Sequence, residues 1–307
     1  MHFTRNWALV LAIAAAVAPA CVAFGQELTE PTAAPSAVPA PAPVGDFQVT
    51  VAPALWLSRV RGNTTFGGPN FTVDDELGLN AYEGSINGEV SVGWGEFYEA
   101  MLTGWYFSTD ASLASTTAGS FGNATIAIGD RLSNSFSAAS VGGEFDVTLW
   151  QPFADQVTPW SGRVQPTTAT DSVSDDRPKA DLRFKAIGAV RWYGASLTVD
   201  DQTSATSGSW TLNAVMPGIG GGIELDLDLK DRLPWVESLA FEASGAIGSN
   251  FTNEQYFTFI RAGITANFTP SVGVSLGYRL EDFKLNDNSA TFDGGVQGLF
   301  IGADIKF

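Results

Sequence analysis

Apolar residues in this chain recur at every second position over ten separate segments, and this period of two constrains its fold more than any other feature. Successive side chains of a β-strand point to opposite faces of a sheet, whereas a helix repeats its apolar face every three or four residues. The alternation therefore predicts an all-β chain. The predicted strands are residues 47–57, 85–94, 97–110, 132–150, 181–199, 210–230, 238–251, 255–268, 272–285 and 292–307.

The last of these segments shows how the two faces differ. Leu299, Ile301 and Ile305 share one face, and Asp304 and Lys306 share the other. A sheet with an apolar outer face suits lipid only if it closes on itself, because an open edge would leave backbone groups unpaired in hydrocarbon. The pattern predicts an antiparallel, transmembrane, up-and-down β-barrel of about ten strands, with eight or twelve as alternatives.

The first residues of the chain predict export. Arg5 precedes a short apolar run over residues 7–18, and small residues follow. This run is shorter than the roughly 20 residues of a spanning helix, so residues 1–25 read as a secretory signal peptide. Cys21 leaves a lipoprotein open as an alternative. Residues 26–45 are rich in Pro and Ala and predict an extended periplasmic linker, and residues 46–307 form the barrel.

The topology places short links on the periplasmic side and longer ones outside. We expect extracellular loops near residues 65–79, 112–131, 200–209 and 286–291. The connection 151–179 is long although it falls on the periplasmic side, so it is either an insertion or a sign that one hairpin is missing from the count. Aromatic residues cluster at the strand ends, as rings at headgroup depth do: Trp94, Trp150, Trp235, Phe268 and Phe307 at one rim, and Tyr106, Trp192, Phe251 and Tyr256 at the other.

Composition excludes several classes of function. The chain carries 33 acidic residues against 16 basic ones, for a net charge of −17, which argues against binding nucleic acid. His2 is the only histidine and Cys21 the only cysteine, and both lie in the predicted signal peptide. A mature chain without them lacks the side chains of Ser-His-Asp and Cys-His catalysis and of ordinary zinc or haem sites. We expect neither an enzyme nor a cofactor.

Several segments resemble a widespread group of bacterial outer-membrane β-barrel proteins, often labelled porin-like or OmpA-like and mostly uncharacterised. The resemblance rests on residues 51–62, 184–192, 277–280 and 292–293 and on the closing pattern Gly302-x-x-Ile305-x-Phe307. It implies location in the outer membrane, contact with its lipid and lipopolysaccharide, and assembly by the barrel assembly machinery, which reads Gly302, Ile305 and Phe307. The group has no agreed catalytic or ligand residues. Phe300 departs from the pattern, which usually has a polar residue there.

The inward positions of the predicted strands collect both acids and bases. The acids are Glu89, Glu99, Glu144, Asp146, Glu224, Asp226, Asp228, Glu242 and Asp304, and the bases are Arg183, Lys185, Arg191, Lys230, Arg261, Arg279 and Lys306. A barrel of this size is filled by its own side chains, so cross-strand ion pairs are expected to plug the lumen.

The favoured interpretation is a monomeric barrel with a structural or surface-interaction role and a lumen filled largely by ion pairs. The alternative is a narrow passive channel whose opposed charges select ions. A lipid-acting enzyme is a remote third hypothesis. Loop acids, namely the pair Asp74 and Asp75 and the pair Asp287 and Asp293, are candidates to hold a divalent cation that bridges lipopolysaccharide.

Overall fold

The computed structural model describes residues 47–94, 97–152, 180–230, 232–251, 254–287 and 289–307. Ten long strands carry the architecture, and each pairs antiparallel with the next. They are β1 (Phe47–Phe66), β3 (Glu83–Trp94), β4 (Tyr98–Ala114), β7 (Arg131–Trp150), β8 (Ala180–Asp201), β9 (Thr206–Asp228), β10 (Ser238–Ser249), β11 (Tyr256–Thr269), β12 (Val272–Asn286) and β13 (Ala290–Lys306). No helix in the described part of the chain is long and apolar enough to cross a membrane.

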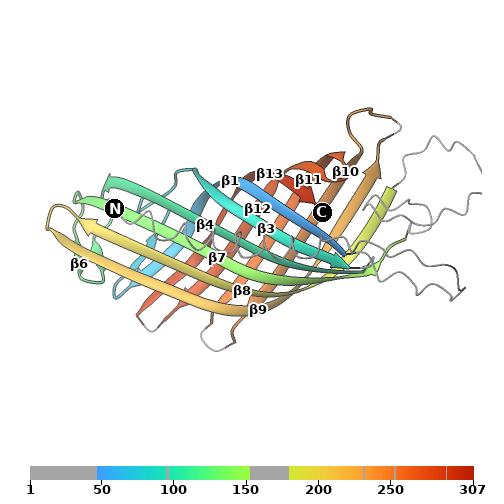
Figure 1. Cartoon of the computed structure of the whole chain (residues 1–307). Coiled ribbons are helices and arrows are strands. Elements are labelled where there is room, and N and C mark those ends of the chain that lie inside the picture. Colours follow the sequence, from blue (N-terminus) through green and yellow to red (C-terminus); the bar gives the residue numbers. More distant parts are fainter. Residues whose placement is uncertain (1–46, 95–96, 153–179, 231, 252–253, 288) are drawn as a thin grey trace, which may run out of the picture. The chain divides into compact units, whose positions relative to one another are not determined.

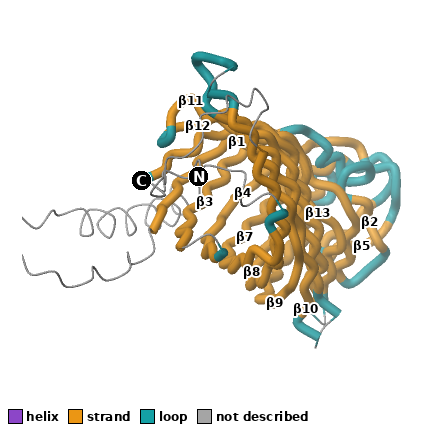
Figure 2. The backbone as a smooth tube through the Cα atoms, turned by 90° about the vertical axis from the view of Figure 1, so that its right-hand side faces the viewer, coloured by secondary structure: helices purple, strands orange, loops and turns teal. Residues whose placement is uncertain are grey.

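The sheet closes because β13 pairs with β1 (Figures 1 and 2). The shared register runs from Lys306 opposite Thr50 to Ala290 opposite Phe66. Beyond it, the amide of Phe307 donates to the carbonyl of Val49 at 2.9 Å. The prediction of an all-β, ten-stranded antiparallel barrel is confirmed, and the alternatives of eight and twelve strands are wrong.

The strands on either side of the long connection after β7 are neighbours in the barrel. The strands β7 and β8 pair directly with each other, from Leu132 opposite Asp201 to Trp150 opposite Phe184. The count of ten therefore needs no extra hairpin at this point. Residues 153–179 lie outside the described residues, as do the predicted signal peptide and the Pro-rich linker.

Three short strands in the loops were not predicted. The strand β2 (Asn70–Thr72) pairs with the end of β1, while β5 (Gly119–Phe121) and β6 (Ala124–Ile126) form a small hairpin. Gly122 turns this hairpin with a φ of 58°, a conformation that glycine adopts without strain. All three lie at the end of the barrel opposite Phe47 of β1 and Lys306 of β13. We call it the loop end, and we call the end at Phe47 and Lys306 the chain-end rim.

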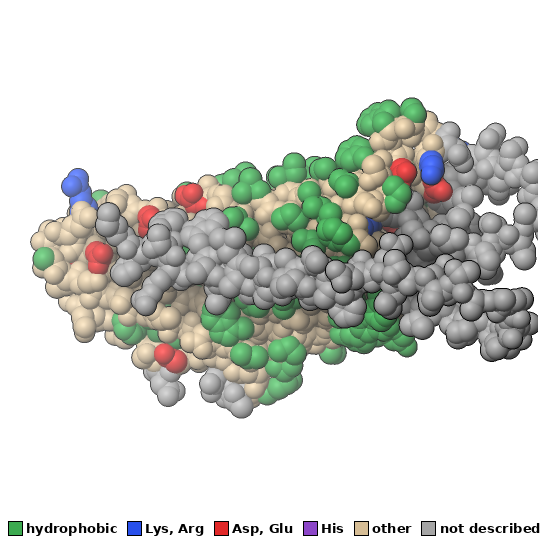
Figure 3. Space-filling model, in the orientation of Figure 1, with side chains coloured by type: hydrophobic (Ala, Val, Ile, Leu, Met, Phe, Trp, Pro, Cys, Tyr) green, Lys and Arg blue, Asp and Glu red, His purple; other side chains and the backbone are tan. Residues whose placement is uncertain are grey.

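Large apolar side chains face outward on every long strand in the half of the barrel next to the chain-end rim. We call this ring the apolar band, and its side chains are 38–74% exposed. The band consists of Leu55, Leu57, Ile86, Leu102, Phe145, Val190, Val215, Ile219, Ile223, Ile247, Ile260, Ile264, Val274, Leu276, Leu299 and Ile301. In Figure 3 hydrophobic side chains crowd the right half of the view, while the left end, where β6 lies in Figure 1, is mostly polar.

Toward the loop end the two faces exchange character. On four neighbouring strands, β4, β7, β8 and β9, the outward side chains are short and polar and match in three cross-strand rows. The rows are Ser108, Ser137, Ser196 and Thr211; Asp110, Ser135, Thr198 and Ser209; and Ser112, Ser133, Asp200 and Ser207. The strands therefore continue past the apolar band as a water-facing barrel.

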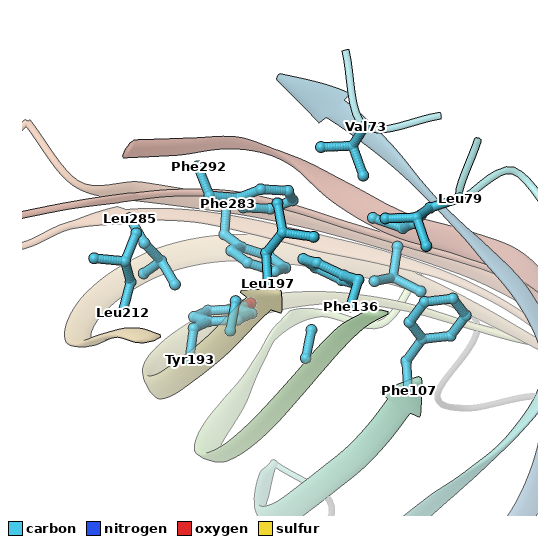
Figure 4. Close-up of a cluster of buried hydrophobic side chains, with 14 of the residues drawn as sticks. Val73, Leu79, Phe107, Phe136, Tyr193, Leu197, Leu212, Phe283, Leu285 and Phe292 are labelled. Carbon is cyan, nitrogen blue, oxygen red and sulfur yellow. The ribbon is translucent and has the colours of Figure 1, made fainter. Parts of the chain in front are cut away.

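The interior of this second half is an apolar core. Five of its aromatic residues have no exposed surface: Trp56, Phe107, Phe136, Phe283 and Phe292. Figure 4 shows side chains of this cluster reaching inward from several strands and meeting one another.

The loop between β2 and β3 completes the apolar core from the loop end. Val73, Leu77 and Leu79 are fully buried in this core. The side-chain amide of Asn134, on β7, donates to the carbonyl of Leu77 at 2.8 Å. Residues of the predicted loop 65–79 thus fill the barrel mouth.

Candidate functional site: the charged lumen

The centre of the lumen holds one carboxylate surrounded by donors. Glu281, on β12, has no exposed surface. Its Oε1 accepts hydrogen bonds from Arg279 Nη2 at 2.7 Å and from Arg191 Nη1 at 3.2 Å. Its Oε2 accepts one from the hydroxyl of Tyr193 at 2.5 Å. Because residues two apart on a strand share a face, Arg279 and Glu281 reach the lumen together.

This central cluster extends across the barrel to β3. Arg279 Nη1 lies 3.2 Å from Glu89 Oε1, and the other oxygen of Glu89 accepts a hydrogen bond from Arg261 on β11. Arg261 also approaches Glu242 at 3.7 Å. On the opposite side Arg191 pairs with Glu144 of β7. Buried charges persist only when paired, and here each guanidinium meets two carboxylates.

A second cluster lies nearer the chain-end rim, around Glu224 on β9. Lys185 Nζ lies 2.6 Å from Glu224 Oε2, and Arg183 Nη1 lies 3.4 Å from Oε1. Arg183 also pairs with Asp181 and, at 3.5 Å, with Asp226. The side chains of Arg183, Lys185 and Glu224 are 16–25% exposed, so water reaches this cluster more readily than the central one.

Aromatic side chains lie between the central cluster and the loop end. The ring centroids of Tyr193 and Phe283 are 4.9 Å apart, and those of Phe283 and Phe292 are 5.2 Å apart. Trp56 packs edge-on against Trp105 at 5.5 Å, and the guanidinium of Arg279 lies 5.9 Å from the Trp56 ring. The lumen therefore changes from charged to apolar along its axis.

The structure brings most of the predicted lumen residues into ion pairs. Those residues are Glu89, Glu99, Glu144, Arg183, Lys185, Arg191, Glu224, Asp226, Glu242, Arg261 and Arg279. Asp146 and Asp304 are buried on the inward face. Asp228, at the end of β9, accepts a hydrogen bond from the amide of Lys230 at 3.1 Å.

One predicted lumen position is wrong, and two participants were missed. Lys230 follows the end of β9 in a turn, where its side chain is 72% exposed, because the ladder stops at Asp228. The missed residues are Tyr193 and Asp181, although both fall on the inward register of β8. Alternation also places Glu281 inward, but only the structure shows that it joins two arginines.

The three residues of the predicted assembly signal occupy different positions on β13. Gly302 stands opposite Ala54 and Ile305 opposite Val51, and Phe307 is 73% exposed at the chain end. The unusual Phe300 points inward and is 4% exposed. Its ring fits over Gly277 of β12, where an added Cβ would come within 2.6 Å of it.

The loop acids show no metal site. Within the described residues no three or more Asp, Glu, His or Cys side chains are grouped to hold a metal ion. Asp287 accepts hydrogen bonds from the amides of Ser289 and Ala290, both at 2.8 Å, and from the hydroxyl of Ser289. These bonds lower the pKa of Asp287. Its carboxylate is thus engaged in its own turn.

The sequence matches no known family and no curated protein. Solved structures of similar fold include the outer membrane protease OmpT from Escherichia coli, with a TM-score of 0.44 and 10% identity over 85% of this chain and 97% of that one. Ail, the attachment invasion locus protein of Yersinia pestis, has a TM-score of 0.35 and 10% identity over 85% and 99%. Neisserial surface protein A has a TM-score of 0.27 and 12% identity over 85% and 97%.

Proposed function

We propose that this chain is an integral β-barrel of the bacterial outer membrane with a structural or surface-interaction role, and that its lumen is closed to solutes. Catalysis is not part of this proposal. The observation that supports it is the pairing of inward charges in one half of the barrel and the burial of an aromatic core in the other.

The apolar band supports the membrane placement. Soluble monomers rarely expose a contiguous apolar patch larger than roughly 300–600 Å². Here exposed Leu, Ile, Val and Phe side chains form a band round the barrel, with at least one on each of the ten long strands. A spanning strand needs about 9–11 residues, and β9 has 23, so the rest of the barrel projects into water. Stacked rings such as Trp94 on Tyr98 and Trp150 on Phe184 lie at the chain-end rim, at the depth of the headgroups.

The aromatic core supports a closed lumen over a passive channel. A channel for ions or small solutes needs a continuous polar path. The rings of Tyr193, Phe283, Phe292 and Phe136 follow one another at 4.9–5.3 Å across the barrel. Removing water from these rings stabilises the fold. The charged part of the lumen is then open only toward the chain-end rim and closed toward the loop end.

Placement and closure have separate tests. In a Cys21→Ala background, a fluorophore on Leu276→Cys should be quenched by brominated phosphatidylcholine, and one on Ser209→Cys should not; equal quenching would contradict the placement. For closure, liposomes carrying the folded protein should not swell in an iso-osmotic pentose solution. Swelling at the rate given by a known porin would establish a channel instead.

A further inference from the structure

A groove of about 580 Å³ runs over the outer surface of β11, β12, β13 and β1. It is lined by outward side chains of these strands and by Thr72 and Asp74 beside β1. It lies outside the barrel wall, so it is separate from the lumen. The lumen network plays no part in it.

One side of the groove is fixed by an ion pair that spans two strand intervals. Arg61 on β1 and Asp282 on β12 are both register partners of Gly295 on β13. The Arg61 side chain reaches across this glycine, and its Nη2 lies 3.0 Å from Asp282 Oδ2. A Cβ at position 295 would come within 2.4 Å of Asp282 Oδ1. Glycine at this position leaves room for the pair.

The next row toward the loop end is held by a tyrosine. Asp293 on β13 and Tyr256 on β11 are both register partners of Lys284. The Tyr256 hydroxyl donates to Asp293 Oδ1 at 2.8 Å. Tyr256 is 40% exposed, and its phenol ring offers a flat apolar surface.

The side of the groove that faces the chain-end rim is apolar. Ile260 and Leu280 are register partners and line the groove. Ile260 belongs to the apolar band, and Ile264 and Leu276 continue the band from there. The groove therefore opens directly onto the surface that we place in lipid, at the level where that surface becomes polar.

This arrangement favours an uncharged polyhydroxyl ligand. Asp74, Asp282 and Asp293 supply acceptor oxygens, and Arg61 supplies donors already shared with a carboxylate. Three carboxylates against one guanidinium line the groove and would repel a phosphate group, and the neighbouring Lys284 is itself paired with Glu254 at 3.6 Å. Sugar hydroxyls both donate and accept, and hydrogen bonds to carboxylates are among the stronger ones. A phenol ring beside them suits the apolar face of a sugar.

We propose that this groove binds the uncharged sugar headgroup of a glycolipid in the outer leaflet, with the sugar against Asp282, Asp293 and Tyr256 and the first acyl carbons along Ile260 and Leu280. This proposal rests on the membrane placement proposed above. It assigns the surface role of the barrel to one face.

The test uses the full mature chain in phosphatidylcholine nanodiscs and counts retained lipids by native mass spectrometry. Monogalactosyl diacylglycerol should be retained at least fivefold more than phosphatidylethanolamine or phosphatidylglycerol of the same acyl chains. Asp282→Asn and Asp293→Asn should each abolish most of this preference. Asp110→Asn is the matched control, since Asp110 is an exposed outward aspartate of β4, two strands beyond the β1 edge of the groove. Free galactose should compete only weakly.

Each other outcome overturns the proposal in a different way. Equal retention of the three lipids would mean ordinary annular lipid, and a preference for phosphatidylglycerol would mean an anion site. A preference that survives both groove substitutions would place the sugar elsewhere. Strong competition by free galactose would point to a soluble saccharide. If the unaltered chain fails to enter nanodiscs at all, the membrane placement itself fails.

Discussion

Glu281 and Arg279 form the central contact of the lumen, with Glu281 Oε1 2.7 Å from Arg279 Nη2 and 2.9 Å from its Nε. Both side chains are at most 2% exposed, and both come from one strand. The same oxygen also accepts from Arg191, so a single carboxylate neutralises charge from β8 and β12 together.

Replacing Glu281 with Ala should destabilise the barrel by about 3 kcal/mol, because two buried guanidinium groups lose a shared partner. Urea titration of the refolded protein in lipid vesicles would measure this loss. Arg61→Ala is the control, since its pair with Asp282 is 44% and 31% exposed and should contribute less than about 1 kcal/mol. Equal losses in the two variants would show that the central cluster is no more important than a surface pair.

Phe283→Ala should cost about 3–5 kcal/mol, the usual range for an aromatic side chain removed from a packed core. Phe283 has no exposed surface and packs against Tyr193 and Phe292. Leu276→Ala, on the outward face of the same strand and 58% exposed, should cost less than half as much. The comparison needs unfolding curves of both variants in one lipid. A larger loss at Leu276 would argue against a packed interior.

Gly277→Ala should lower stability because the new Cβ would lie 2.3 Å from the carbonyl oxygen of Ala262 as well as close to Phe300. The ring could turn aside, but the backbone could not, so we expect a loss of about 1–3 kcal/mol. Gly143→Ala is the control, since the nearest atom to its added Cβ is 4.0 Å away. The temperature at which the folded form shifts on a heated gel would report both variants.

Glu76 should make the packing of two loops depend on pH. Its Oε1 accepts from the Thr117 hydroxyl at 2.6 Å and its Oε2 from the Thr72 amide at 2.7 Å. These bonds, led by that of Thr117, lower the pKa of Glu76. A group whose pKa is lowered on folding stabilises the folded state above its unfolded pKa and loses that effect as pH falls through the folded pKa.

The protection of backbone amides from hydrogen exchange, relative to the unfolded chain at the same pH, should therefore fall in residues 67–82 and 115–130 below about pH 4. Glu76→Gln should show reduced protection already at pH 7, since a neutral amide side chain binds these donors more weakly. Protection in both loops that is independent of pH and of the substitution would remove Glu76 from this role.

Alternation predicted the strands and favoured ten over eight or twelve, and the closing pattern and the aromatic positions added the support for a membrane barrel. Ile301 and Asp304 already show which face meets lipid, and Arg279 and Glu224 were placed in the lumen correctly. What remained hidden was the exchange of faces along the longer strands. In β4, Trp105 and Phe107 point inward and Ser108 and Asp110 outward, so the period is unchanged while the apolar face switches sides.

That switch explains why ion pairs were expected to fill the whole lumen. Periodicity reports that one face is apolar, but it does not report whether lipid or core covers that face. The roles of Val73 and Leu77 also escaped prediction, because a loop that folds into a barrel mouth has no period. The groove beside Tyr256 depends on register across four strands, which only the closed barrel defines.

The most direct test of the closed lumen is ion conductance across a planar bilayer after insertion of the refolded protein, with its folded state confirmed by resistance to unfolding on an unheated gel. The account predicts a silent membrane for the unaltered chain and for Glu224→Ala, because the aromatic core lies between that residue and the loop end. Discrete conductance steps in the unaltered chain, with an ion selectivity that changes in Glu224→Ala and Arg279→Ala, would contradict it and identify the charged lumen as a filter.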